Sequence, residues 1–176
     1  NNRMRELSNR RAIAAMPVAG SYRSIDFALS NMTNSHIAKV AVLTQYNARS
    51  LNEHLSSSKW WNFGRKQGGL FVFTPTITPD NSFWYQGTAD AIYQNLEYIE
   101  TYNPDYVLIL SGDHIYKMDY EVMLEYHKAN NADVTIACMP VPIEEASRFG
   151  IVITDENNRI SEFEEKPANP RSNLAS

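Results

Sequence analysis

Short aliphatic runs that alternate with helix-patterned segments constrain the fold of this chain more than any other feature of its sequence. The predicted strands are residues 39–44, 69–74, 105–111, 132–139, 149–154 and 159–164. The first four are near-continuous apolar runs, as strands buried on both faces of a sheet should be. Because strands that alternate with helices are typical of α/β proteins, we predict an α/β domain with a largely parallel sheet.

Helical spacing of apolar residues predicts helices in the intervening segments. The segment 88–101 carries one apolar stripe, with Thr88 expected to cap it and Asp90 in its first turn. A carboxylate in the first turn suits the positive end of the helix dipole. The segment 75–84 contains two prolines and is predicted to be a loop. Further helices are predicted over 25–34, 47–57 and 119–130.

Composition excludes several classes of protein. A formal net charge of −4, without a run of lysine or arginine, disfavours nucleic-acid binding. No apolar run approaches the roughly 18 residues of a membrane span. Cys138 is the only cysteine, which excludes a disulfide within the chain and favours a reducing compartment. Its apolar neighbours predict that it is buried.

Asp113 is the first candidate for chemistry, because it follows directly on the apolar run 105–111. Ligands of open α/β sheets bind beyond the carboxyl ends of the strands, so this carboxylate is placed where a ligand sits. It suits Mg²⁺, which proteins commonly bind together with substrate phosphates, and Gly112 permits a close approach. An aspartate that only caps the following turn is equally compatible with the spacing.

Gly87 and Thr88 form the second candidate, since they open a predicted helix whose free backbone N–H groups favour an anion. The alternative is a capped helix start after a loop. The neighbouring aromatic residues Trp84 and Tyr85 could line a sugar pocket, but from the residues alone we expect them to cover the core.

Glu165 and Lys166 form the third candidate. Adjacent residues on a strand point to opposite faces, so both can reach one cleft only if the backbone bends near Pro167. A solvated, charged strand end is the alternative. The histidines show no metal-binding spacing, and His127 is expected to be a hydrogen-bonded helix residue.

Several motifs of other enzyme classes are missing from the sequence. There is no G-x-G-x-x-G, no P-loop, no G-x-S-x-G and no paired-cysteine metal motif. A Rossmann dehydrogenase and a P-loop kinase are therefore disfavoured. The residues alone predict an α/β domain with an aspartate at a strand end and turns that suit phosphate.

Six stretches together, in order along the whole chain, resemble the glucose-1-phosphate adenylyltransferase family, also called ADP-glucose pyrophosphorylases. They are RSIDFALSNMTNS (23–35), VLTQYNARSLNEHL (42–55), WYQGTADAIYQN (84–95), LSGDHIYKMDY (110–120), EEASRFGI (144–151) and FEEKPANP (163–170). The resemblance implies a Rossmann-like, GT-A-like nucleotidyltransferase domain with three layers and a mixed, largely parallel sheet over residues 1–176. It also implies synthesis of ADP-glucose and pyrophosphate from ATP and glucose 1-phosphate, in glycogen biosynthesis.

The resemblance also assigns roles to residues and partners. It implies that Asp113 binds the Mg²⁺ cofactor and that Asp113, Lys166 and Arg3 are catalytic. It further implies an allosteric, cytoplasmic enzyme that forms homo- or hetero-tetramers and binds neither nucleic acid nor membrane. The implied nucleotide-binding residues are Arg3, Gln45, Gly87, Thr88 and Gly112. The residues implied to bind glucose 1-phosphate are Tyr85, Gly150, Glu165 and Lys166.

Departures from the family pattern concentrate in the N-terminal half. Ile13 stands where many members carry a lysine that binds a sugar-phosphate activator, Ala14 replaces a proline, and Ala19 replaces a glycine. These changes resemble a weakly catalytic regulatory subunit, which is the alternative reading. A nucleotide-sugar glycosyltransferase is disfavoured because no D-x-D motif follows 105–111. We expect the chain to be an inactive fragment that lacks the glycine-rich phosphate loop and the C-terminal β-helix domain.

Overall fold

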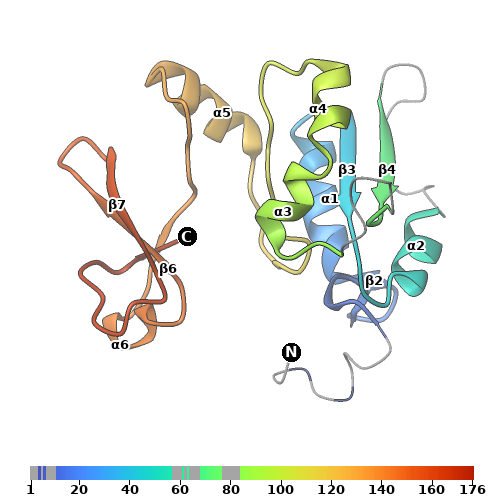
Figure 1. The fold of residues 1–176 in the computed structure, drawn as a ribbon, viewed down its shortest axis with the longest axis horizontal. Helices are drawn as coiled ribbons and strands as arrows, with labels where there is room; N and C mark the ends of the chain where they lie inside the picture. Colours follow the sequence, from blue (N-terminus) through green and yellow to red (C-terminus); the bar gives the residue numbers. More distant parts are fainter. Residues whose placement is uncertain are drawn as a thin grey trace. The chain divides into compact units, whose positions relative to one another are not determined.

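The computed structural model describes residues 4, 6, 11–56, 61, 63, 68–76 and 84–176. By its contacts the chain divides into two compact units, Asn1–Tyr120 and Glu121–Ser176. Figure 1 draws the helices and strands of both. Arg3, expected to be catalytic and to lie on the nucleotide side, is outside the described residues.

A parallel strand pair is the framework of the N-terminal unit. β3 (Lys39–Leu43) pairs with β4 (Gly69–Phe73) in a register that runs from Lys39 opposite Gly69 to Leu43 opposite Phe73. The predicted strands 39–44 and 69–74 are therefore confirmed. Parallel pairing needs a crossover connection, which α2 (Arg49–Ser56) contributes to here, so the predicted α/β class is confirmed as well.

Two helices build the core of this unit beside the strand pair (Figure 1). α1 (Ser24–Asn34) and α2 (Arg49–Ser56) lie within or close to the predicted helices 25–34 and 47–57. Leu29, Leu51 and Leu55 are buried in one apolar cluster. Each such side chain stabilises the fold by about 1.5–3 kcal/mol relative to leaving it in water.

The carboxylate of Asp26 holds the first turn of α1. Its Oδ2 accepts a hydrogen bond from the backbone N–H of Arg23 at 2.9 Å, which caps the helix. Its Oδ1 lies 2.7 Å from Nε2 of His54 on α2; the Asp26 side chain is buried and the His54 side chain is mostly buried. One carboxylate therefore closes a helix end and ties α1 to α2.

The other end of α1 holds residues 116–120. The side-chain amide of Asn31 donates to the carbonyl of Tyr116 at 3.0 Å. Ser35, the C-cap residue, accepts the backbone N–H of Tyr120 at 2.8 Å. These bonds fix residues 116–120 against α1, immediately after Asp113.

Short elements precede α1. They are the 3₁₀ helix η2 (Ile13–Ala15) and the antiparallel strands β1 (Pro17–Val18) and β2 (Tyr22–Arg23). Arg23 donates from Nη1 to the carbonyl of Ala15 at 2.5 Å, and Ser24 donates to the carbonyl of Ile13 at 2.9 Å. The turn before α1 is thereby fixed to η2.

The predicted helix 88–101 is broken into α3 (Thr88–Tyr93) and α4 (Leu96–Tyr102). Asn95 causes the break, because its side-chain amide donates to the carbonyl of Ala91 at 2.8 Å and competes with regular helix bonding. The expected cap is also wrong. Gly87 is the N-cap residue and Thr88 is the first helical residue, with no side-chain capping bond.

The predicted strands 105–111 and 132–139 are wrong, apart from Met139. Within the described chain neither run is paired, and Ile109 and Val134 are 63% and 68% exposed. A strand is defined by a neighbour that completes its backbone hydrogen bonds, and an apolar run does not supply one. Cys138, expected to be buried, is exposed for the same reason.

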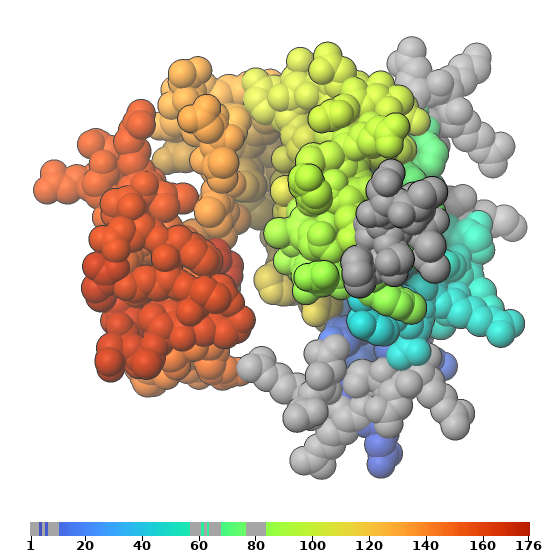
Figure 2. All heavy atoms as spheres, viewed as in Figure 1, coloured from blue at the N-terminus to red at the C-terminus, as the bar shows by residue number. Residues whose placement is uncertain are grey.

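A four-stranded antiparallel sheet organises the C-terminal unit, in the order β5-β8-β6-β7. Its strands are β5 (Met139–Pro140), β6 (Gly150–Thr154), β7 (Ile160–Glu165) and β8 (Leu174–Ala175). The predicted strands 149–154 and 159–164 are thus confirmed. Ile151 and Val152 of β6 are almost completely buried. Figure 2 shows the atoms of this unit in orange to red.

The helices of the C-terminal unit are α5 and the short α6 (Ile143–Ala146). α5 (Tyr120–Ala129), which starts at the boundary residue, confirms the predicted helix 119–130. His127 lies 2.8 Å from the hydroxyl of Thr135, as expected of a hydrogen-bonded helix histidine. In the part of the chain that the structure describes, every helix is too short or too polar to cross a bilayer.

We expect Asp26→Ala to lower the free energy of unfolding by about 2–4 kcal/mol. The substitution removes a helix cap worth about 1 kcal/mol and takes the buried carboxylate away from His54. Urea denaturation followed by circular dichroism measures the loss. Asp105→Ala, at an exposed carboxylate of the same unit, is the control and should change stability by no more than about 0.5 kcal/mol. Equal effects of the two substitutions would contradict the role of Asp26.

Candidate active site

Gln45 and Tyr85 are joined just beyond the end of β3. The side-chain amide of Gln45 accepts the backbone N–H of Tyr85 at 2.6 Å and donates to its carbonyl at 3.3 Å. The hydroxyl of Tyr85 accepts a hydrogen bond from Asn95 at 3.1 Å. The Tyr85 backbone is therefore fixed to β3, and its ring is fixed to the break between α3 and α4.

Two aromatic rings form an exposed stack beside this pair. Tyr46 and Trp84 have ring centroids 5.5 Å apart and planes inclined by 5°. Both are more than half exposed, so the expectation that Trp84 covers the core is wrong. Sequence reasoning did not single out Tyr46. Its position next to Gln45, in a motif of the resemblance, was the available signal.

The start of α3 has open space but also a negative charge. A Cβ added to Gly87 would meet no atom within 4 Å, and its φ of 178° is extended backbone that any residue adopts. Asp90 accepts the backbone N–H of Gln86 and the side-chain amide of Gln94, both at 2.8 Å. A phosphate bound at Gly87 and Thr88 would therefore lie near this carboxylate.

Asp113 is exposed in the turn that follows residues 105–111. Its Oδ1 accepts the hydroxyl of Ser111 at 2.5 Å, and an ionised carboxylate has further lone pairs for a ligand. A Cβ on Gly112 would lie 3.4 Å from Cβ of Ala14, an ordinary van der Waals distance, so this turn packs against η2. The turn that carries Asp113 therefore lies against η2 and the start of α1.

The residues around Asp113 fit one kind of magnesium site. Among the described residues no group of three or more histidine, cysteine, aspartate or glutamate side chains could hold a metal ion. A cation cage made only of protein ligands is therefore not formed by this part of the chain. Mg²⁺ that binds mainly through substrate phosphates needs one or two carboxylates, and the exposed Asp113 meets that requirement.

Glu165 and Lys166 meet at the end of the β6–β7 hairpin. β7 ends at Glu165, and Lys166 turns the chain with a left-handed φ of 46°. The Lys166 ammonium forms an ion pair with Glu165 Oε1, and both side chains are more than half exposed. Adjacent strand residues can share one site only where the backbone bends, and Lys166 provides this bend.

Gly150 lies directly across the hairpin from Glu165. A Cβ at this position would come within 2.6 Å of the Phe163 ring and 2.9 Å of the Ser176 hydroxyl oxygen. The backbone N–H of Lys166 donates to the carbonyl of Phe149, the residue before Gly150, at 3.0 Å. The missing side chain of Gly150 therefore allows the hairpin end to close tightly.

The structure brings together only some of the predicted site residues. Gly150, Glu165 and Lys166 form one cluster in the C-terminal unit, and the pair Gln45 and Tyr85 belongs to the N-terminal unit. The remaining described candidates, Gly87, Thr88, Gly112 and Asp113, also belong to the N-terminal unit.

Comparison with known proteins gives one consistent result. Residues 1–176 match the family described as nucleotidyl transferase. Glucose-1-phosphate adenylyltransferases from Lachnospira eligens, Geobacillus stearothermophilus and Thermotoga maritima are 60%, 55% and 54% identical to the chain, each over 99% of it. The matched region is 41%, 45% and 41% of these relatives, so the chain spans less than half of their length. The resemblance found in the sequence is confirmed.

We expect Gly150→Ala to lower the free energy of unfolding by about 1–2 kcal/mol, because the new methyl group overlaps the Phe163 ring and the Ser176 hydroxyl, and both side chains must move. Thermal unfolding measures the change. Gly87→Ala is the matched control: its methyl group enters open space, so stability should change by no more than about 1 kcal/mol. Unchanged stability of Gly150→Ala would contradict the tight packing at Gly150.

Proposed function

Because the chain belongs to the nucleotidyl transferase family, we propose that it is the nucleotidyltransferase part of an enzyme that makes ADP-glucose and pyrophosphate from ATP and glucose 1-phosphate. Relatives that carry the name glucose-1-phosphate adenylyltransferase support this substrate pair. The proposal includes a role in glycogen biosynthesis and a cytoplasmic, tetrameric, allosteric enzyme, as the resemblance implies.

The turn at Lys166 is the observation that carries the proposal. It sets an ammonium group beside the Glu165 carboxylate, opposite the backbone of Gly150. An ammonium can bind the phosphate of a sugar phosphate, and a carboxylate can accept hydrogen bonds from sugar hydroxyls. The Lys166 ammonium and the Glu165 carboxylate are exposed and adjacent, so one ligand with a phosphate and hydroxyls can reach both. Tyr85 is proposed to add a contact to the sugar.

The proposed reaction is a direct displacement. A phosphate oxygen of glucose 1-phosphate attacks the α-phosphorus of ATP, a new P–O bond forms, and the bond to the β-phosphate breaks to release pyrophosphate. No protein nucleophile is needed, so the protein must align two anions that repel each other. Orientation of this kind can lower a barrier by roughly 7–11 kcal/mol. Lys166 neutralises part of the charge on the sugar phosphate.

The nucleotide side is proposed to lie in the N-terminal unit. Asp113 would hold Mg²⁺ together with the phosphates of ATP, and bound Mg²⁺ would neutralise charge on those phosphates. Gln45 positions Tyr85 through its backbone, and Gly87, with open space at its Cβ position, permits close approach of the nucleotide. Arg3 is proposed as a further cation for the triphosphate. The nucleotide contacts of this proposal are Arg3, Gln45, Gly87, Thr88 and Gly112.

A weakly catalytic regulatory subunit is the second candidate. Ile13 and Ala14 lie in η2, and Ala14 packs against the buried cluster that includes Ile25. Because position 13 is an isoleucine, this turn carries no lysine for an activator. The two candidates separate in one assay, because a regulatory subunit gains substantial activity only with a partner subunit. A catalytic subunit makes ADP-glucose when assayed alone.

We expect Asp113→Asn in the full-length protein to lower kcat for ADP-glucose synthesis by at least about 100-fold, because an amide replaces the charged Mg²⁺ ligand. Pyrophosphate release at several Mg²⁺ concentrations measures the loss. Asp133→Asn, at another exposed aspartate, should leave turnover unchanged. Normal turnover by Asp113→Asn would overturn the role given to this carboxylate.

A further inference from the structure

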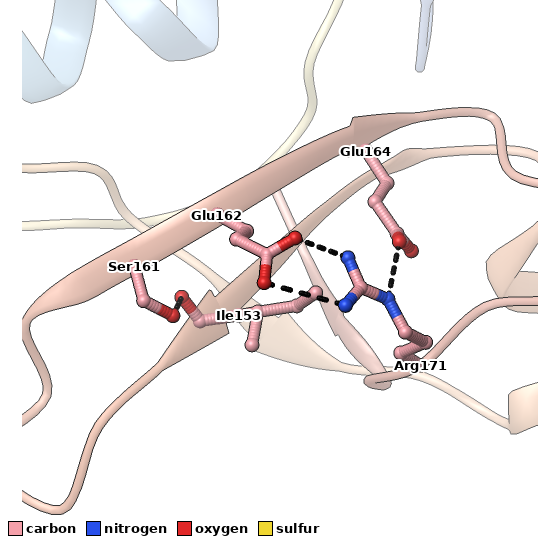
Figure 3. Close-up of polar contacts among 5 residues, drawn as sticks. All are labelled: Ile153, Ser161, Glu162, Glu164 and Arg171. Carbon is pink, nitrogen blue, oxygen red and sulfur yellow. Dashed lines mark hydrogen bonds and ion pairs between the residues drawn. The ribbon is translucent and has the colours of Figure 1, made fainter.

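Figure 3 shows Arg171, from the loop that follows β7, in contact with Glu162 and Glu164 of that strand. Its Nε donates to Oε1 of Glu164 at 2.6 Å, and its Nη1 donates to Oε1 of Glu162 at 3.3 Å. Its Nη2 also forms an ion pair with Oε2 of Glu162. The planar guanidinium thus engages two carboxylates, with a forked contact to Glu162.

Both carboxylates lie on one face of β7. Glu162 and Glu164 are two residues apart on the strand, so their side chains share a face, while Phe163 and Glu165 point to the other. A cation held between two neighbouring carboxylates also removes their mutual repulsion. Arg171 therefore stabilises this face of the strand as well as the loop that carries it.

The Glu164 contact is less exposed than an ordinary surface ion pair. The Glu164 side chain is 21% exposed, compared with 53% for Glu162. Its second oxygen, Oε2, is buried and has no hydrogen-bond partner among the described residues. Removal of the guanidinium would leave a largely buried carboxylate without its cation, which is more unfavourable than the loss of a solvated pair.

Glu162 is ionised over the neutral pH range in this arrangement. Hydrogen bonds and charge from Arg171 lower the pKa of the Glu162 carboxyl below its usual 4.5. A group with a lowered pKa contributes stability above its unfolded-state pKa and loses that contribution as the pH falls through the folded-state value. The contact is therefore complete at neutral pH and weakens only in acid.

The loop between Lys166 and Asn173 is attached at its two ends. The Lys166 N–H bonds to the carbonyl of Phe149 at 3.0 Å, and the carbonyl of Asn173 accepts the N–H of Val141 at 2.9 Å. Between these points Pro167 and Pro170 have no N–H to donate. In the described part of the chain, the side-chain bonds that join this loop to β7 are those of Arg171.

Lys166 needs such an attachment because its backbone is strained. A φ of 46° lies in the left-handed region, which is unfavourable for a residue with a side chain and persists only when the surroundings impose it. The bond to Phe149 holds Lys166 on one side. Arg171 holds the chain that leaves Lys166 on the other.

We propose that Arg171 is a positioning residue that fixes the turn at Lys166, and so the place of its ammonium group, through the contacts with Glu162 and Glu164. The inference rests on the proposed function, in which Lys166 binds the phosphate of glucose 1-phosphate. Arg171 itself need not touch the substrate.

Steady-state kinetics of Arg171→Met in the full-length protein test the inference. We expect the KM for glucose 1-phosphate to rise by about three- to tenfold, with the KM for ATP unchanged, because only the sugar-phosphate contact is displaced. Arg171→Lys keeps a charge but cannot form the fork, so its effect should be smaller. Glu162→Gln should shift the same KM in the same direction and serves as the second variant should Arg171→Met fold poorly.

A double substitution separates positioning from general stability. In a Lys166→Ala background, adding Arg171→Met should have no further effect on the KM for glucose 1-phosphate. Arg159→Met, at the far end of the same hairpin, is the matched control and should leave both KM values unchanged.

The outcomes distinguish the two proposals. If the wild-type protein makes ADP-glucose while Arg171→Met changes neither KM, or both equally, the positioning role is overturned and the proposed function stands. A full effect of Arg171→Met in the Lys166→Ala background would also overturn the positioning role and leave the proposed function standing. A wild-type protein that does not use glucose 1-phosphate would overturn the proposed function and this inference together.

Discussion

The buried carboxylate of Asp26 is the interaction on which the N-terminal unit most depends. It closes the first turn of α1 and binds His54 of α2, so the two helices that bury the core are fixed by one side chain. The far end of α1 then holds Tyr116 and Tyr120 through Asn31 and Ser35. Since Asp113 lies just before these contacts, a core interaction determines where an exposed carboxylate is presented.

The C-terminal unit also fixes charged groups in place, but through a hairpin end. A hairpin end, with a glycine on one strand and a left-handed lysine after the other, places Glu165 and Lys166 together. The lysine conformation is locally unfavourable, and the surrounding bonds to Phe149 and through Arg171 impose it. Each unit thus presents charged groups from a short turn that its own packing fixes.

The sequence predicted the paired strands and most helices because their patterns report burial directly. Strands 39–44 and 149–154 have apolar side chains that, apart from Ala41, the sheets bury or half-bury, so their apolar runs were sufficient. The run 105–111 has the same pattern but no paired neighbour in the described chain, and composition cannot supply a hydrogen-bonding partner. The break at Asn95 depends on one side-chain bond, which no hydrophobic pattern reveals.

The candidate site was predictable to a similar degree. The resemblance identified Gly150, Glu165 and Lys166, and the structure brings these three together. The bend at Lys166 and the contacts of Arg171 could not be predicted, because both depend on the tertiary arrangement of a loop and a strand. Exposed stacking of Tyr46 on Trp84 was missed for the same reason, since aromatic residues in sequence suggest burial first.

The most direct measurement is a crystal structure of the full-length protein with Mn²⁺ in place of Mg²⁺, a non-hydrolysable ATP analogue and glucose 1-phosphate. We expect an anomalous metal peak about 2.1 Å from a carboxylate oxygen of Asp113, and the sugar phosphate within hydrogen-bond distance of the Lys166 ammonium. A metal peak distant from Asp113, or a sugar phosphate bound away from Lys166, would contradict the account.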